Sequence, residues 1–170
     1  MSRCATHCWI YLSIIILGGI LLAQETKPVS ETKMVACEFQ DGKQMSVRYP
    51  LGITVRTEKP RMGQLWTPGG SPLVLFTQTD LMLAGIAIPT GAYFMYVIPD
   101  KHNWTLVVNR NVTAGASYDQ RQDLVRVPME LGSFSEPQPF SVALAHVAPT
   151  KCDMRINFGE IGSWAEFTEE

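Results

Sequence analysis

The stretch Leu81–Arg110, LMLAGIAIPTGAYFMYVIPDKHNWTLVVNR, decides the fold. It contains three short apolar runs separated by two turns, one at Ala87–Gly91 and one at Pro99–Asn103. An extended middle run has apolar side chains on both of its sides, with Tyr93 on one side and Tyr96 on the other. A strand of this kind needs cover on both faces. We therefore place it inside a sheet sandwich, with Tyr93 in the core.

The same two-residue periodicity continues outside this stretch. Residues 35–39 and 45–49 alternate on either side of Asp41-Gly42-Lys43, which predicts a hairpin. Residues 124–129, 140–146 and 154–158 also alternate, and no segment after the first 25 residues has a sustained helical period. The sequence therefore predicts an all-β fold, a single antiparallel β-sandwich of jelly-roll-like type.

Four finer expectations follow from the pattern. Ile53 and Val55 predict a further short strand, and Ser135–Pro139 (SEPQP) predicts a stiff connector. Pro128 cannot donate a ladder hydrogen bond, so its strand should lie near a sheet edge. His146 alternates in phase with apolar residues and should point toward the core.

The first 23 residues have the layout of a secretory signal peptide. Arg3 supplies a positive start, and Trp9–Ala23 is an uncharged apolar run that is shorter than the ~20 residues needed to span a bilayer. Residues 24–32 form a polar, flexible leader, and residues 33–168 form the single β-sandwich domain. We expect a secreted or periplasmic protein that does not insert in the membrane after cleavage behind Ala23. The alternative is a signal segment that is kept as an anchor.

Two cysteines remain once the expected signal peptide is removed, Cys37 and Cys152. In an oxidising compartment they most simply form a disulfide, which would join the N-terminal and C-terminal strands. The alternative is two free, buried thiols. The mature chain offers no further cysteine, and only His102 and His146 could assist as ligands, so we predict no metal site.

A set of spaced residues resembles a known family. They are Cys37-x-Phe39, Asp41-Gly42-Lys43, Val47-x-Tyr49, Leu65-Trp66, Gly85-Ile86-x-Ile88-Pro89-x-Gly91-x-Tyr93, Pro99, Trp104, Asp123-Leu124-x-Arg126 and Cys152. The order is similar to that of exported bacterial proteins catalogued as domain of unknown function 2911, in an acidobacterial-type variant with two cysteines. The resemblance implies the fold and export, and it implies no activity.

The chain departs from that family after Trp66. Members usually have Arg and then Thr-Gly-Ala-Asn at this point, where this chain has Thr67-Pro68-Gly69-Gly70-Ser71. They also have a longer basic, glycine-rich connector in place of residues 57–63. A binding site that the family forms through that arginine would be lost or altered here.

Composition and motifs argue against several classes of function. The 14 basic and 16 acidic residues nearly balance, and the basic residues do not cluster, so we expect no nucleic-acid partner. The chain lacks a Gly-x-Ser-x-Gly elbow, a His-Glu-x-x-His motif and a phosphate-binding glycine loop before a helix. We predict no catalytic residue and no cofactor.

Two groups of residues are candidates for ligand binding. Trp66 and Trp104 lie beside turns, where an aromatic ring can be a stacking platform, although both also suit the core. The densest run of mixed charge is Asp119, Arg121, Asp123 and Arg126, which could orient a polar ligand or stabilise its own loop. From this segment, the candidate ligand-binding residues are Tyr118, Asp119, Arg121 and Asp123.

The sequence thus indicates an exported, non-catalytic binding or structural module whose ligand would be an envelope glycan or peptide. One alternative is a cell-envelope hydrolase that uses Asp119 or Asp123 as acid or base; close carboxylates in a cleft with one raised pKa would favour it. An aromatic shelf without converging titratable groups would favour binding. Another alternative is an assembly subunit that pairs through a strand edge.

Overall fold

The computed structural model describes residues 31–170, and the expected signal peptide and most of the expected leader lie outside this range. Two short 3₁₀ turns, η1 (Pro68–Gly70) and η2 (Gln120–Gln122), lie in connections. The nine strands are β1 (Thr32–Glu38), β2 (Gln44–Pro50), β3 (Leu73–Thr77), β4 (Leu81–Leu83), β5 (Ile86–Ile88), β6 (Gly91–Ile98), β7 (Trp104–Asn109), β8 (Asp123–Ala148) and β9 (Lys151–Glu169).

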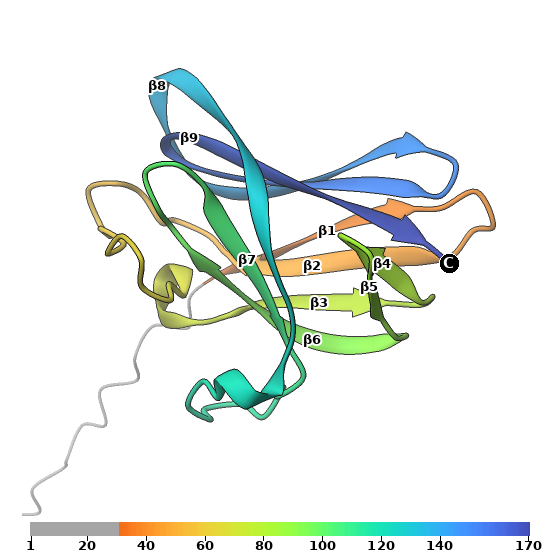
Figure 1. Cartoon of the computed structure of the whole chain (residues 1–170). Helices are drawn as coiled ribbons and strands as arrows, with labels where there is room; N and C mark the ends of the chain where they lie inside the picture. Colours follow the sequence, from red (N-terminus) through yellow and green to blue (C-terminus); the bar gives the residue numbers. More distant parts are fainter. Residues whose placement is uncertain (1–30) are drawn as a thin grey trace, which may run out of the picture.

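The nine strands pair in the order β1-β2-β3-β6-β7-β8-β9-β4-β5, and every pairing is antiparallel. Figure 1 shows β1, β2, β3 and β6 side by side, with the long β8–β9 hairpin crossing over them. The sheet therefore folds over itself into two layers. This confirms the predicted all-β, sandwich-type fold.

The jelly-roll-like character lies in the strands β3 to β6. β3 pairs with β6 in one layer, while the β4–β5 hairpin that separates them in sequence pairs with β9. The chain thus leaves one layer after β3 and returns to it at β6. Within residues 31–170, the structure contains no helix long and apolar enough to cross a membrane.

The core lies between the layers and is formed by alternate residues of each strand. Val47, Leu75 and Tyr93 occupy one cross-strand row of β2, β3 and β6, and all three are buried. Tyr93 is 8% exposed, and its hydroxyl donates a hydrogen bond to the carbonyl of Pro89 at 2.8 Å. The predicted core position of Tyr93 is confirmed.

The predicted hairpin is also confirmed. β1 and β2 are joined by a turn in which Gly42 adopts a φ of +85°, a left-handed conformation that glycine accepts without strain. The amide of Lys43 donates to the Asp41 carboxylate at 2.9 Å, and the amide of Phe39 donates to the carbonyl of Lys43 at 2.8 Å. The Asp-Gly pair therefore sets the register of the first two strands.

Three of the finer expectations fail. Ile53 and Val55 form no strand, because the chain turns at residues 54–57 through hydrogen bonds between the backbone and the hydroxyls of Thr54 and Thr57. Ser135–Pro139 is part of β8, which accommodates it through register shifts against β9. His146 is exposed, although it pairs with the buried Cys152; it lies near the end of the hairpin, at a register shift between residues 146 and 148.

The expectation for Pro128 is confirmed locally. Residues 123–129 of β8 pair with β7 on one side, and pairing of β8 with β9 begins only at Glu130. The proline therefore lies in a stretch that has a neighbour on one side alone. A proline is tolerated more easily in such a stretch than in a strand that is paired on both sides.

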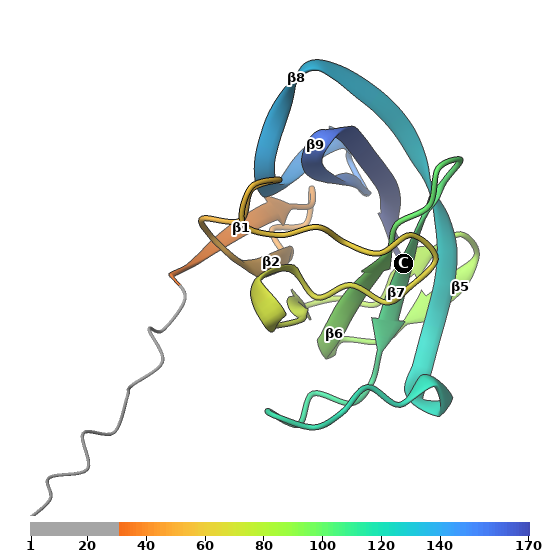
Figure 2. The same ribbon diagram turned by 90° about the vertical axis from the view of Figure 1, so that its left-hand side faces the viewer.

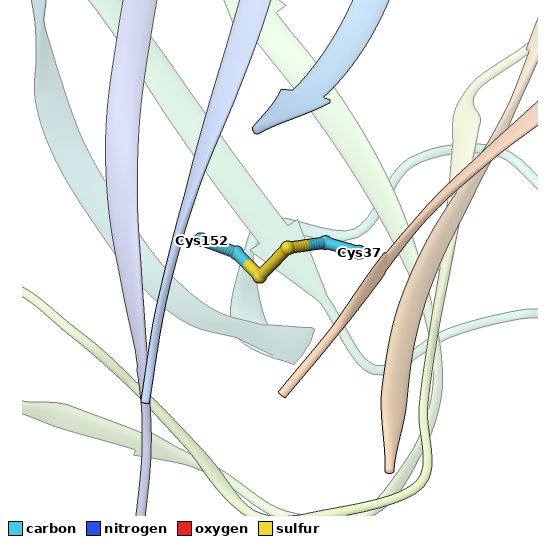
Figure 3. Close-up of a disulfide and its surroundings, with 2 residues drawn as sticks. All are labelled: Cys37 and Cys152. Atoms are coloured by element: carbon cyan, nitrogen blue, oxygen red, sulfur yellow. A yellow bond between two sulfur atoms is a disulfide. The ribbon is translucent and has the colours of Figure 1, made fainter. Parts of the chain in front are cut away.

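A disulfide joins Cys37 on β1 to Cys152 on β9, with a Cα–Cα distance of 6.4 Å (Figure 3). The two cysteines are 4% and 0% exposed, so the bond is enclosed in the core. It links the first strand to the last across the two layers, as predicted.

Replacing both cysteines, Cys37→Ser and Cys152→Ser, should lower the melting temperature of the oxidised protein substantially. The bond closes a loop of 115 positions, and closure of a loop of about 100 residues stabilises by at most about 4.7 kcal/mol. Thermal unfolding followed by circular dichroism measures the change. The unsubstituted protein treated with a reductant should melt like the double variant; equal melting of oxidised and double-variant protein would contradict a stabilising role.

The substitution Tyr93→Asp should prevent folding, because it places a carboxylate among fully buried apolar side chains. The matched variant Tyr93→Phe removes only the hydrogen bond to Pro89 and should cost about 1 kcal/mol. Soluble yield and near-ultraviolet circular dichroism distinguish the two outcomes. A folded Tyr93→Asp protein with native melting would contradict the core placement.

Candidate binding groove

The layer formed by β1, β2, β3 and β6 has an ordered row of side chains on its outer face. Register places Arg48 of β2 opposite Val74 of β3, and Val74 opposite Phe94 of β6. Tyr96 lies two residues further along β6, on the same face, opposite Val107 of β7. Tyr93 and Met95 face the core, so this second apolar side of β6 faces away from it. Phe94 is half-buried there, and Tyr96 is buried, with 5% of its surface exposed.

A cavity of about 670 Å³ lies over this row. Its volume is within the range of small-molecule sites. We call it the sheet groove. The residues that line it are Thr32, Arg48, Tyr49, Pro50, Leu65, Thr67, Gly70, Ser71, Pro72, Val74, Phe94, Tyr96, Ala114, Gly115, Ala116 and Tyr118.

One wall of the groove is the connection between β2 and β3, which Trp66 anchors to the core. The indole ring packs against Phe140 at 5.5 Å and Phe158 at 4.8 Å between centroids, and its Nε1 donates to Glu58 Oε1 at 2.6 Å. The other carboxylate oxygen of Glu58 accepts from the amide of Gly69 at 2.8 Å. Glu58 therefore ties the wall segment to the buried tryptophan.

Gly69 is required at its position in this wall. Its φ is +65°, and a Cβ there would approach the side chain of Ile53 to 3.0 Å and that of Pro50 to 3.3 Å. The segment 67–71 thus packs closely onto the end of β2. This is the segment where the family resemblance expected Arg-Thr-Gly-Ala-Asn, and it lines the sheet groove without an arginine of its own.

The opposite wall is the connection 110–119, and Tyr118 is its main side chain. The Tyr118 ring meets Tyr96 edge-on, with 5.0 Å between centroids. Its hydroxyl donates to Asp123 Oδ2 at 2.6 Å and accepts a hydrogen bond from the guanidinium of Arg126. Figure 2 shows the two connections that flank the groove on the same end of the molecule.

Asp123 does not line the groove, but its carboxylate accepts hydrogen bonds that hold this wall in position. Its Oδ2 also accepts from Arg126 Nε at 2.5 Å, and its Oδ1 accepts from Asn109 Nδ2 at 2.7 Å. The same amide of Asn109, a fully buried side chain, donates to the carbonyl of Asp119 at 2.9 Å. The wall is therefore held by a connected set of charge-assisted hydrogen bonds.

The electrostatics of the wall keep Tyr118 neutral. Burial, and then the hydrogen bond to the Asp123 carboxylate, raises the pKa of Tyr118 to about 12. Burial also raises the pKa of Tyr96, with the charge of Asp123 as a smaller cause. Two phenols thus stand on the groove as neutral rings throughout the physiological range.

Asp119 and Arg121 lie away from the groove. The guanidinium of Arg121 donates to both carboxylate oxygens of Asp119 at 3.0 and 2.9 Å, and its amide donates to Oδ1 at 3.0 Å. These hydrogen bonds lower the pKa of Asp119. The pair stabilises the η2 turn that leads into β8.

The structure separates the six predicted ligand-binding residues into three places. Tyr118 lines the sheet groove, and Asp123 holds it in position; Asp119 and Arg121 pair with each other outside it. Trp66 and Trp104 are in the core, 5% and 3% exposed, with their rings edge-on at 6.1 Å.

Sequence reasoning missed Arg48, Phe94 and Tyr96 as groove residues. A signal for two of them was present, because the apolar second side of the 93–98 run includes Phe94 and Tyr96. We interpreted that side as interior. Tyr96 is indeed buried, but it packs against Tyr118 of a connection instead of a second sheet, and Phe94 is half-buried and lines the groove.

A second, smaller cavity of about 370 Å³ lies at another place, where the 55–62 segment meets the 99–101 turn. Trp104 and Phe158 form its floor, and Val55, Met62 and Ile161 are apolar neighbours. Lys59 and Lys101 stand at its rim, and both are exposed. Within residues 31–170, no group of three or more His, Cys, Asp or Glu side chains is placed to hold a metal ion.

Comparison with known proteins identifies the family. A family model described as "Protein of unknown function (DUF2911)" matches residues 31–164, which is almost the whole part of the chain that the structure describes. The chain belongs to this family. No curated protein matches the DUF2911 chain, and no solved structure matches it. The match includes both cysteines and both walls of the sheet groove.

The raised pKa of Tyr118 predicts a change in the free energy of unfolding at high pH. The pKa of Tyr118 in the folded state is about 12, above the ordinary value of 10. The free energy that the neutral phenol contributes to folding should therefore be fully present below pH 10 and be lost as the pH rises through 12. Chemical denaturation of the unsubstituted protein and of Tyr118→Phe at pH 8, 10 and 11.5 measures the effect. The difference in free energy of unfolding between the two should shrink at pH 11.5; a constant difference would contradict the raised pKa.

Proposed function

We propose that this DUF2911 protein is an exported, non-catalytic binding module that holds a glycan in the sheet groove. The observation that supports it best is the composition of the groove. A floor and wall of aromatic rings, Phe94, Tyr96 and Tyr118, adjoin hydroxyl-bearing residues at the rim, Thr67 and Ser71. Sugars present an apolar C–H face and a hydroxyl edge, which suit these two kinds of surface.

The position of the groove favours side-chain recognition over strand addition. β3 lies beneath it and is already paired with β2 on one side and β6 on the other. A bound chain therefore finds no free backbone groups on the floor with which to extend the sheet. Stacking and side-chain hydrogen bonds remain, and these suit a carbohydrate.

The carboxylates support binding over hydrolysis. A glycosidase needs two carboxyl groups beside the bond that it cuts, one of them with a raised pKa. Asp119 and Asp123 do not line the sheet groove, and both are engaged by neighbouring side chains. Arg121 lowers the pKa of Asp119 instead of raising it.

Export is supported by two independent features. The first 23 residues have the pattern of a secretory signal, and Cys37 and Cys152 form a disulfide of a kind that persists in oxidising compartments. A ligand from the cell envelope would then be accessible to the groove.

Mature protein should bind at least one envelope-type oligosaccharide, and Tyr118→Ala should weaken that binding about tenfold or more. Removing the ring takes away the main aromatic surface of one wall of the groove. A glycan panel read by thermal shift, followed by calorimetry on the hits, measures the affinities.

The matched control is Phe134→Ala, which truncates a ring that is 39% exposed and does not line the groove. It should leave affinity unchanged. Equal weakening by both substitutions, or binding of peptides and no glycan, would contradict the proposal. Tyr118→Phe separates the ring from the hydroxyl, because it keeps the stacking surface and should retain most of the affinity.

A further inference from the structure

Arg48 is the one charged residue among the described residues that line the sheet groove. It projects from β2 on the outer face and is exposed. The other lining side chains are apolar, aromatic or hydroxyl-bearing. Any full charge that a ligand meets inside the groove, from residues 31–170, is therefore positive.

The guanidinium of Arg48 is held but is not neutralised. Its central carbon lies over the Phe76 ring, 5.8 Å from the centroid, which is a cation–π contact with a residue of β3 that does not line the groove. Within residues 31–170, no side-chain hydrogen bond or ion pair of Arg48 is formed. By contrast, Arg121 is paired with Asp119 and Arg126 with Asp123.

The spacing of the groove suits a ligand that has both a ring and an acidic group. Arg48 and Phe94 belong to the same cross-strand row, with β3 between their strands. Neighbouring strands are about 4.8 Å apart, so the strand of Arg48 lies about 10 Å from that of Phe94 and Tyr96. One sugar residue can stack at Phe94 and Tyr118 while its neighbour reaches the guanidinium.

We propose that the sheet groove selects acidic glycans, with Arg48 as the residue that binds the sugar carboxylate. This inference rests on the proposed glycan-binding function and adds the class of ligand. A guanidinium binds a carboxylate through two parallel N–H···O bonds, and the open site lets both form. Phe94 and Tyr118, which are both half-buried, would supply the stacking surface, and Arg48 would supply the selectivity.

The experiment compares acidic oligosaccharides with their own methyl esters, which keep the rings and remove the charge. The probes are tri-galacturonate, a hyaluronan tetrasaccharide and a disaccharide that contains N-acetylmuramic acid, each as free acid and as ester. Calorimetry at low salt should give at least one acid that binds about tenfold or more tighter than its ester. Raising the salt to 0.5 M should reduce the affinity for the acid and leave that for the ester nearly constant, to within about twofold.

Arg48→Gln should bring the affinity for the acid down to that for its ester. Arg48→Lys should retain part of the preference, because a lysine keeps the charge and loses the bidentate geometry. The matched control is Arg56→Gln, a change of the same type at an exposed arginine in the turn that follows β2 and outside the groove lining. It should leave the acid-to-ester ratio as it is.

The outcomes separate the two proposals. Esters that bind as tightly as acids, or an acid preference that survives Arg48→Gln, would overturn the role of Arg48 while glycan binding stands. If neither form of any glycan binds, or if binding of both forms is insensitive to Tyr118→Ala, the proposed function fails and this inference fails with it.

Discussion

The architecture depends on the pairing of one strand, β8. Its first residues pair with β7, and from Glu130 onward it pairs with β9. A single strand thus belongs to both layers, and the change of partner along its length turns the sheet over on itself. Register shifts after Ser133, Gln138 and His146 provide the local bending that such a course requires.

β6 shows how the same fold forms a groove as well as a core. Tyr93, Met95 and Val97 alternate with Phe94, Tyr96 and Ile98 along the strand. The first set faces the space between the layers, and the second set faces the opposite side of the sheet. The inner set packs between the layers, and Phe94 and Tyr96 of the outer set form the floor over which Tyr118 closes. Rigid, fully paired strands therefore support the groove, and only its walls come from connections.

The fold class could be predicted because it rests on local signals. Alternation in the 93–98 run and the Asp41-Gly42 turn each act over a few residues. Cys37 and Cys152 are the two of the four cysteines that lie outside the expected signal, so they have a single possible pairing with each other. The length of β8 could not be predicted, because Ser135–Pro139 looks like a connector until β9 pairs beside it. Residues 53–55 alternate like a strand and are a turn, since local hydroxyl hydrogen bonds replace a partner strand.

The candidate site could be predicted only in part, for a related reason. Tyr118 and Asp123 belong to one dense polar segment, so the sequence draws attention to them. Arg48 is an isolated arginine in an alternating strand, and it becomes notable only when tertiary pairing sets it beside Val74 and across from Phe94. The partners of a long-range row cannot be inferred from the spacing of any one of its members.

The bond between Cys37 and Cys152 has one more consequence, which concerns cleavage of the chain. It makes a covalent ring of everything between β1 and β9, including the exposed turn at 54–57 and the connection 110–122. A protease that cuts once in either segment leaves two pieces that are still joined through sulfur. A molecule that has been cut once therefore still runs as a single species until it is reduced. Reduction of the disulfide is needed to release the two fragments.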